Sequence, residues 1–278
     1  MRYEDLLNMI KDFDILIVRS KTKVDREVIE RGIRLKIIAR AGSGLDNIDV
    51  NAANAKGIIV INAPEAPVNS VAELTIGLMI AAARRVVELS LKTKNGVWHK
   101  AMGVELYGKT LGIIGLGRIG GRVAEIAKAL GMNVIAYDIA DVTEKAKRIG
   151  VQLVSSLDDI LRESDIISLH VPLTKETYHM IDYRELELMK NGVIIVNTSR
   201  GAVINTRALL DALNRGKVAA AALDVLEHEP PREPWELELI RHPRVIVTPH
   251  IGSQTKEAQE RIAYEILKKI GLILKEGA

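Results

Sequence analysis

Residues 110–138 read TLGIIGLGRIGGRVAEIAKALGMNVIAYD, and this stretch decides the fold that we expect. An apolar run enters the turn GLGRIG, a pattern with helical spacing follows, and Gly131 closes that helix. A second apolar run then ends at Asp138. A strand, a glycine turn, a helix, a strand and a carboxylate in this order predict a βαβ unit that binds a dinucleotide.

Each glycine of the turn has a physical role in this interpretation. Gly115 permits the tight turn, Gly117 lets the backbone approach a pyrophosphate, and Gly120 lets the helix pack close to the strand. The helix N-terminus then offers N–H groups and a positive dipole end to the phosphates. A glycine turn can also be a purely structural connection, but the flanking strands, the helix and the acid together favour a cofactor site.

Asp138 indicates which cofactor binds. It follows Gly120 at close to the roughly 20-residue offset expected for the carboxylate that receives the adenosine ribose. A 2′-phosphate would meet like charge there, and no arginine follows at once in the sequence. The sequence therefore favours NAD(H) over NADP(H).

The composition is that of a globular protein. Of 278 residues, 47% are apolar and 27% are charged, and 39 basic against 36 acidic residues leave a net charge of +3. This balance argues against a nucleic-acid surface, and the absence of cysteine excludes disulfides and thiolate metal sites. The longest apolar run, residues 74–83, is too short to span a membrane, so we expect a cytoplasmic protein. Abundant Ile, Lys, Arg and Glu indicate a thermophilic source.

The order of apolar runs predicts an α/β protein with two doubly wound parallel-sheet domains. A long helix is expected over residues 67–94, and the periodicity is lost over residues 94–108, which makes this segment the first hinge. A C-terminal helix is expected over residues 255–275. The remaining strands are expected at 14–18, 35–39, 58–62, 152–154, 166–170, 193–197, 219–223 and 245–248.

The loop after the second predicted strand reads RAGSGLDN and offers a possible anion site. Gly42 and Gly44 expose backbone N–H groups around Ser43, and Arg40 lies at the mouth of this turn. An ordinary glycine turn with a solvated arginine explains the same residues equally well.

Three polar residues at the ends of predicted strands suit hydride transfer with a 2-hydroxy acid. Arg200 can hold a carboxylate, His250 can exchange the proton of the C2 oxygen, and Glu229 can orient that histidine. Each of them could instead have a structural role in its loop. The other histidines show no metal-ligand spacing, so no metal site is expected; they are His99, His170, His179, His228 and His242.

The motifs GLGRIG with Asp138, NTSRG at 197–201, LDVLEHEPP at 223–231 and TPHIG at 248–252 occur in this order. Together they resemble the D-isomer-specific 2-hydroxyacid dehydrogenase family over essentially the whole chain. Within that family, RAGSGLDNID at 40–49 is most similar to the members that oxidise D-3-phosphoglycerate with NAD⁺, the entry into serine synthesis. The chain ends at Ala278, so we expect no C-terminal regulatory domain.

The resemblance implies a central Rossmann domain for NAD, residues 95–256, and a discontinuous, flavodoxin-like substrate domain, residues 1–94 and 257–278. It implies Arg200, Glu229 and His250 as the catalytic residues and Arg40, Ser43 and Gly44 as substrate contacts. It also implies a homodimer in which residues 96–106, with Trp98, form a contact arm. The cofactor contacts that it implies, beyond the three glycines of the turn, are Arg118, Ile119, Asp138, Val171, Thr198, Ser199, Asp224 and Ser253.

Two other functions are compatible with the same residues. A reductase of glyoxylate or hydroxypyruvate would use the same catalytic residues without a phosphate site. A non-enzymatic NAD-sensing protein could keep them too, although the sequence has no appended peptide-binding or nucleic-acid-binding segment to support that role.

Overall fold

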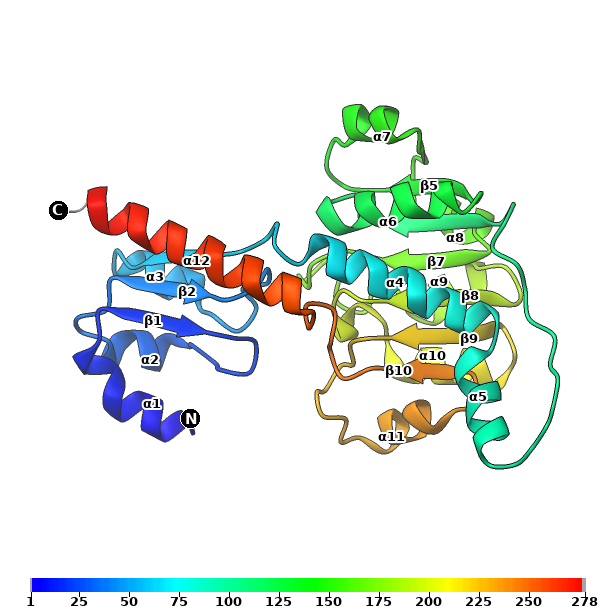
Figure 1. Cartoon of the computed structure of the whole chain (residues 1–278), viewed down its shortest axis with the longest axis horizontal. Coiled ribbons are helices and arrows are strands. Elements are labelled where there is room, and N and C mark those ends of the chain that lie inside the picture. Colours follow the sequence, from blue (N-terminus) through cyan, green and yellow to red (C-terminus); the bar gives the residue numbers. More distant parts are fainter. Residues whose placement is uncertain (1, 277–278) are drawn as a thin grey trace. The chain divides into compact units, whose positions relative to one another are not determined.

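A computed structural model of the chain describes residues 2–276 (Figure 1). Internal contacts divide the chain into two compact units. The first unit is Met1–Ser70 with Ser253–Ala278, and the second is Val71–Gly252. The chain therefore leaves the first unit once and returns to it at the end.

The first unit is built on three parallel strands in the order β1-β2-β3, namely β1 (Ile15–Val18), β2 (Ile37–Arg40) and β3 (Ile59–Asn62). Side chains of β2 alternate between the two faces, as the period of a strand requires. The helices are α1 (Tyr3–Met9), η1 (Ile10–Asp12), α2 (Arg26–Arg31), α3 (Val50–Ala55) and α12 (Lys256–Glu276). Ile38 packs with α1, α2 and α3, whereas Ile37 and Ala39 pack with α12.

The second unit contains seven parallel strands in the order β10-β9-β8-β7-β4-β5-β6. The strand order reverses between β4 and β7, and open parallel sheets bind ligands beyond the carboxyl ends of the strands at such a point. The strands are β4 (Thr110–Ile114), β5 (Asn133–Tyr137), β6 (Gln152–Leu153), β7 (Ile166–Leu169), β8 (Val193–Asn197), β9 (Val218–Leu223) and β10 (Val245–Val247).

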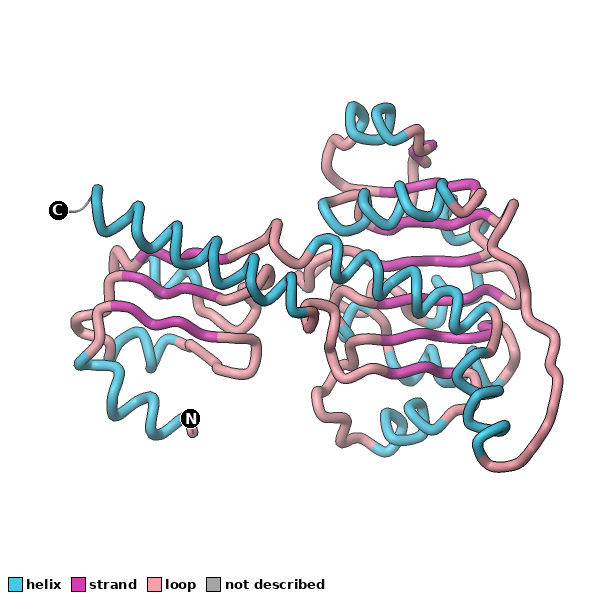
Figure 2. Tube along the Cα trace, in the orientation of Figure 1, coloured by secondary structure: helices cyan, strands magenta, loops and turns pink. Residues whose placement is uncertain are grey.

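Helices cover both faces of this sheet, as Figure 2 shows. On one face α4 (Val68–Ala83), α6 (Arg118–Ala129) and α7 (Thr143–Ile149) pack with Leu111 and Ile113 of β4. On the other face the packing helices are α8 (Leu157–Glu163), α9 (Tyr183–Leu188), α10 (Thr206–Asn214) and α11 (Pro234–Arg241), and the short η2 (Gly201–Val203) precedes α10. The sequence prediction of a doubly wound α/β sheet is confirmed.

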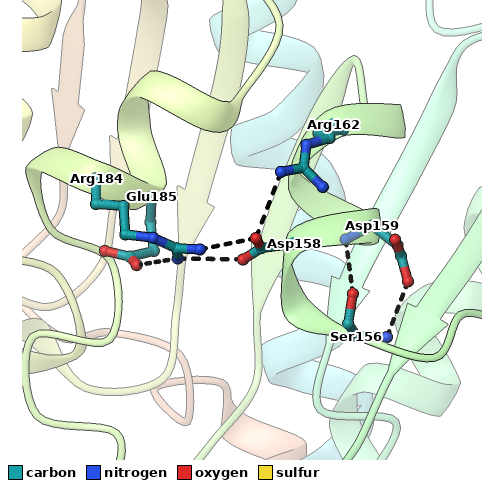
Figure 3. A network of polar contacts seen from close by, with 6 residues as sticks. All are labelled: Ser156, Asp158, Asp159, Arg162, Arg184 and Glu185. Atoms are coloured by element: carbon teal, nitrogen blue, oxygen red, sulfur yellow. Dashed lines mark hydrogen bonds and ion pairs between the residues drawn. The ribbon is translucent and has the colours of Figure 1, made fainter.

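Ion pairs link α8 and α9 on that second face (Figure 3). Asp158 receives both terminal nitrogens of Arg184, at 3.1 and 2.8 Å, and Arg162 approaches it at 3.5 Å. Ser156 caps α8 by accepting the N–H of Asp159, whose carboxylate accepts the N–H of Ser156 in return. This capping box explains why α8 begins where it does.

The helix expected over residues 67–94 is interrupted. It forms α4 and α5 (Val86–Lys94), because Arg85 between them adopts a left-handed conformation with φ 55°. The Arg85 guanidinium then donates two hydrogen bonds of 2.8 Å to Glu88. These hydrogen bonds are the largest of the effects that together lower the pKa of Glu88 to about 2. The single long helix of the sequence prediction was wrong because its apolar spacing continues across a backbone break.

The boundaries between the units also differ from those expected. The chain passes from the first unit to the second at Ser70, before α4, and returns at Ser253. Ile76, Met79 and Ala82 of α4 belong to the core of the large sheet. A boundary near residue 94 would separate this helix from the strands on which it packs.

Among residues 2–276, no helix combines the length and the apolar composition that crossing a membrane requires.

Candidate active site

The glycine turn after β4 is shaped by two close backbone approaches. Gly115 has φ 94°, a conformation that favours glycine, and a Cβ built on it would lie 2.7 Å from the carbonyl oxygen of His170. A Cβ on Gly120 would overlap the carbonyl oxygen of Gly115. Any side chain at either position would therefore push the turn or α6 away from the end of β4.

Gly117 differs from Gly115 and Gly120. A Cβ built on Gly117 would lie in open space, with nothing within 4 Å. Gly117 is also the N-cap of α6, which begins at Arg118. The N-terminus of α6 therefore begins beside a space that no side chain fills. The residues present fit the pyrophosphate of a dinucleotide, which needs N–H donors and a close backbone approach. Ile119 packs its side chain against the core.

Asp138 lies one residue beyond β5 and holds the glycine turn through its carboxylate. Its Oδ2 accepts the N–H of Leu116 at 2.8 Å, and its Oδ1 accepts the N–H of Ala140 at 2.9 Å. A carboxylate oxygen can accept more than one hydrogen bond, so Asp138 retains capacity for ribose hydroxyls.

Lys145 contacts the glycine turn, and the sequence did not predict this contact. From α7 its amine donates a hydrogen bond to the carbonyl oxygen of Gly117. Burial, assisted by the charge of Arg148, lowers the pKa of this amine. No motif marks Lys145, because the contact depends on where α7 packs against the turn.

Beyond β8, a buried asparagine shapes the turn that carries Thr198, Ser199 and Arg200. The side-chain oxygen of Asn197 accepts both the N–H and the hydroxyl of Ser199, at 3.0 and 2.8 Å. Its amide nitrogen donates to the carbonyl oxygen of Arg200 at 2.9 Å. Asn197 was not among the predicted site residues, although it opens the NTSRG motif.

The hydroxyl of Thr198 lies 2.8 Å from that of Thr75, a fully buried residue of α4. Thr75 itself donates to the carbonyl oxygen of Val71, so the proton between the two threonines comes from Thr198. The Thr198 side chain is thus fixed by α4.

His170 and Val171 follow β7 beside the glycine turn. Val171 lies against Gly115, since one of its methyl groups would be 3.0 Å from a Cβ there. The His170 ring nitrogen Nε2 lies 2.9 Å from the Ser168 hydroxyl, and burial lowers the pKa of this histidine to about 3. His170 is therefore neutral at pH 7.

His250 and Glu229 are brought into direct contact. Nδ1 of His250 lies 2.8 Å from Oε2 of Glu229, and the other carboxylate oxygen accepts the N–H of Leu226 at 3.3 Å. The two side chains are 38% and 40% exposed. A carboxylate at Nδ1 favours the ring form with its proton on that nitrogen and leaves Nε2 for proton exchange.

Asp224 shapes the turn that presents His250. This carboxylate is 1% exposed and accepts the hydroxyl of Thr248 at 2.6 Å and the N–H groups of Ile251 and Gly252 at 2.8 Å. The N–H of His250 donates to the carbonyl oxygen of Asp224 at 2.9 Å. These bonds hold His250 at φ 54°, a left-handed conformation that costs a side-chain-bearing residue about 1–2 kcal/mol.

Arg200 lies beside the segment that carries Glu229. Its Nη1 donates to the carbonyl oxygen of Ser199 at 2.7 Å. The next residue, Gly201, touches the backbone of Leu226 and Glu227 so closely that a Cβ would overlap it. The absence of a side chain at Gly201 therefore lets the two loops meet, and the sequence analysis did not recognise this requirement.

The predicted substrate contacts lie in the first unit. Arg40 ends β2, and its Nη1 donates to the carbonyl oxygen of Ala41 at 2.9 Å. Gly42 has φ 140°, and a Cβ there would overlap the Arg40 guanidinium. The carbonyl oxygen of Ser43 accepts the Asn62 amide at 2.6 Å. Gly44 is half-buried in the same loop.

Ser253, a predicted cofactor contact, also belongs to the first unit, where its carbonyl oxygen accepts the amide of Gln259 at 2.7 Å. Among residues 2–276, no cluster of three or more His, Asp or Glu side chains is placed to hold a metal ion.

Comparison with known proteins agrees with this architecture. Residues 76–252 match the family model described as D-isomer specific 2-hydroxyacid dehydrogenase, NAD binding domain. The chain belongs to this family, and the resemblance inferred from its motifs is confirmed.

Individual relatives differ in their named substrates. The chain is 51% identical to D-3-phosphoglycerate dehydrogenase of Methanocaldococcus jannaschii over 98% of its own length and 52% of that protein. It is 50% identical to hydroxypyruvate reductase of Thermotoga maritima, over 96% of this chain and 87% of that one. The chain thus spans about half the length of the phosphoglycerate dehydrogenase that it matches.

Among solved structures, the D-lactate dehydrogenase of Aquifex aeolicus complexed with NAD and lactic acid superposes with a TM-score of 0.89. It is 36% identical, and the match covers 97% of this chain and 85% of that one. Its bound NAD agrees with the cofactor predicted from Asp138.

The surroundings of the glycines predict opposite results for two substitutions. Gly117→Ala should fold normally, since its Cβ meets open space, but should weaken NADH binding about tenfold or more because the methyl group occupies the expected pyrophosphate position. Gly120→Ala should lower the free energy of unfolding by about 1–3 kcal/mol, because its Cβ has no room. Thermal unfolding and NADH fluorescence titration measure both effects. Equal loss of stability in the two variants would contradict this assignment.

Proposed function

We propose that the protein oxidises D-3-phosphoglycerate to 3-phosphohydroxypyruvate with NAD⁺, a step that enters serine synthesis in the cytoplasm. The observation that carries the proposed chemistry is the 2.8 Å contact between His250 and Glu229, beyond the carboxyl ends of the strands in an NAD-binding domain. The name and 51% identity of the Methanocaldococcus relative support the choice of substrate.

His250 acts as the general base in this proposal. Its Nε2 takes the proton of the C2 hydroxyl, and the Glu229 carboxylate at Nδ1 stabilises the imidazolium that forms. NAD⁺, when bound, supplies the acceptor for the hydride that leaves C2. In the reverse direction His250 returns the proton to the C2 oxygen.

Arg200 binds the carboxylate of the substrate in this proposal. A guanidinium can hold a carboxylate through two parallel hydrogen bonds and can polarise the neighbouring C2 oxygen. The Asn197 side chain supports this role because it fixes the Arg200 turn through two hydrogen bonds to the backbone and one to the Ser199 hydroxyl.

The NAD contacts proposed for the second unit are the glycine turn with Arg118 and Ile119, Asp138, Val171, the Thr198 to Arg200 turn, and Asp224. We further propose that the first unit is the substrate-binding domain, where Arg40, Ser43 and Gly44 meet the substrate. Ser253, also in the first unit, is proposed as an additional NAD contact.

A reductase of hydroxypyruvate or glyoxylate is the second candidate, because the Thermotoga hydroxypyruvate reductase is 50% identical and is covered over 87% of its length. The kcat/KM values for a panel of phosphorylated and unphosphorylated D-2-hydroxy acids and 2-oxo acids separate the two functions. A preference for unphosphorylated substrates favours the reductase, and no turnover with any of them favours the NAD-sensing role.

Replacement of the proposed base tests the mechanism. His250→Asn should lower kcat by about 10²–10⁴-fold, since Asn cannot accept the substrate proton at neutral pH. NADH affinity, measured by fluorescence titration, should stay within a few-fold of the wild type. Full activity of this variant would exclude His250 as the base.

Replacement of Arg40 tests the phosphate specificity. Arg40→Ala should lower kcat/KM for D-3-phosphoglycerate by about 10–150-fold, because one charge-assisted contact contributes roughly 1.5–3 kcal/mol. Unphosphorylated D-2-hydroxy acids should change little. Arg34→Ala, which removes an exposed arginine of the same unit, is the matched control. If both substrate classes lose activity equally, Arg40 does not select for phosphate.

We also propose a homodimer in which residues 96–106 form the contact arm. Trp98 and Met102 are 86% and 90% exposed, and Val86, Val87, Leu91, Val97, Val104 and Tyr107 nearby in the sequence are exposed as well. Clustered exposed apolar residues of this kind mark interaction surfaces.

Light scattering at micromolar concentration should therefore give the mass of a dimer. Trp98→Ala should shift the equilibrium toward the monomer, whereas Ile33→Ala, an exposed apolar residue of the first unit, should not. A monomeric wild-type protein would refute the assembly.

A further inference from the structure

The contact between Glu229 and His250 is made by two side chains that remain partly exposed, so burial does not hold it in place. Glu229 lies in the loop between β9 and α11, outside any helix or strand. The precision of the contact must therefore come from what anchors this loop.

Glu236, in the first turn of α11, is the main anchor. Its side chain is 1% exposed, although its residue type is seldom buried. Oε1 accepts the backbone N–H and the ring Nδ1–H of His228, both at 3.0 Å. Oε2 accepts the N–H groups of Arg232 and Glu233, also at 3.0 Å.

This set of contacts exceeds what helix capping requires. A glutamate at this position of a helix ordinarily accepts the N–H of the N-cap residue, which here is Glu233. The three further donors, from His228 and Arg232, lie outside the helix. His228 directly precedes the segment Glu229-Pro230-Pro231, and Arg232 directly follows it. One carboxylate therefore holds both ends of the segment that carries Glu229.

The ionised state of Glu236 is favoured by the same contacts. Burial acts to raise its pKa, but the N–H groups of Arg232, Glu233 and His228 outweigh burial and lower that pKa below its ordinary value. Glu236 is thus a carboxylate at neutral pH, and charge-assisted hydrogen bonds of this kind are the strong ones.

A second acidic residue anchors the start of the loop. Oε1 of Glu227 accepts the N–H of Thr206, the first residue of α10, at 2.7 Å, and Oε2 lies 3.2 Å from Nε2 of His179. Glu227 therefore ties the loop toward α10, while Glu236 ties it toward α11.

We propose that Glu236 is a positioning residue, which fixes Glu229 against His250 by holding the N–H groups on both sides of it. This inference rests on the proposed function, in which Glu229 and His250 act as a pair. Glu236 acts through its hydrogen bonds to His228, Arg232 and Glu233.

The first test is Glu236→Gln, which preserves the size of the side chain but places an amide group where two N–H donors need an acceptor. We expect kcat to fall about 10–100-fold while NADH affinity changes less than threefold, because the glycine turn is unaffected. Glu238→Gln removes the same charge from an exposed position of α11 and should keep kcat within twofold. Glu236→Asp, which retains the charge but is one methylene shorter, should lie between the two.

The decisive test is a double-mutant cycle with Glu229→Gln. If Glu236 acts through Glu229, Glu236→Gln should change kcat less than twofold once Glu229 has been replaced. The same loss of kcat in both backgrounds would overturn the proposal, because it would show a general structural effect. Should Glu236→Gln be insoluble, Glu236→Asp completes the same cycle with the same two outcomes.

The cycle also separates this inference from the proposed function. Wild-type activity of Glu229→Gln alone would refute the catalytic pair itself. A large loss in Glu229→Gln, combined with a wild-type kcat in Glu236→Gln, would leave the pair intact and would refute only the positioning role of Glu236.

Discussion

The buried carboxylate of Asp224 is the interaction on which the presentation of His250 depends. Asp224 directly follows β9, and its carboxylate accepts the Thr248 hydroxyl and two backbone N–H groups. The backbone carbonyl oxygen of Asp224 accepts the N–H of His250. A buried carboxylate without these donors would be costly, so the turn and the carboxylate stabilise each other. The left-handed backbone of His250 is maintained by this set of bonds rather than by any local preference of histidine.

The same principle recurs around the site, where buried acids and amides organise loops and glycines allow the loops to touch. Asn197 holds the Arg200 turn, Glu236 holds the Glu229 segment, and Gly201 lets these two loops meet. The residues that they position, Arg200, Glu229 and His250, lie outside regular secondary structure. The site is therefore a set of loops whose backbone N–H groups are satisfied by side chains, and its rigidity comes from those hydrogen bonds.

The large sheet could be predicted from the sequence because its signals are local. Apolar runs mark β4, β5, β7, β8 and β9, and the structure places β7, β8 and β9 within one residue of the bounds expected for them. The interruption of the long helix at Arg85 could not be predicted, since apolar spacing continues across it. The first boundary between the units was also misplaced, because α4 joins the second unit through packing with strands distant in the sequence.

By itself, the sequence determined the family, the doubly wound sheet, the glycine turn with Asp138, and the residue types of the candidate catalytic set. Those features depend on order and spacing along the chain, which a sequence states directly. Only the tertiary structure decided that Glu229 contacts His250, that Asp224 and Glu236 hold their loops, and that Lys145 reaches Gly117. These contacts join residues separated by other elements, so they exist only after the sheet and its helices have packed.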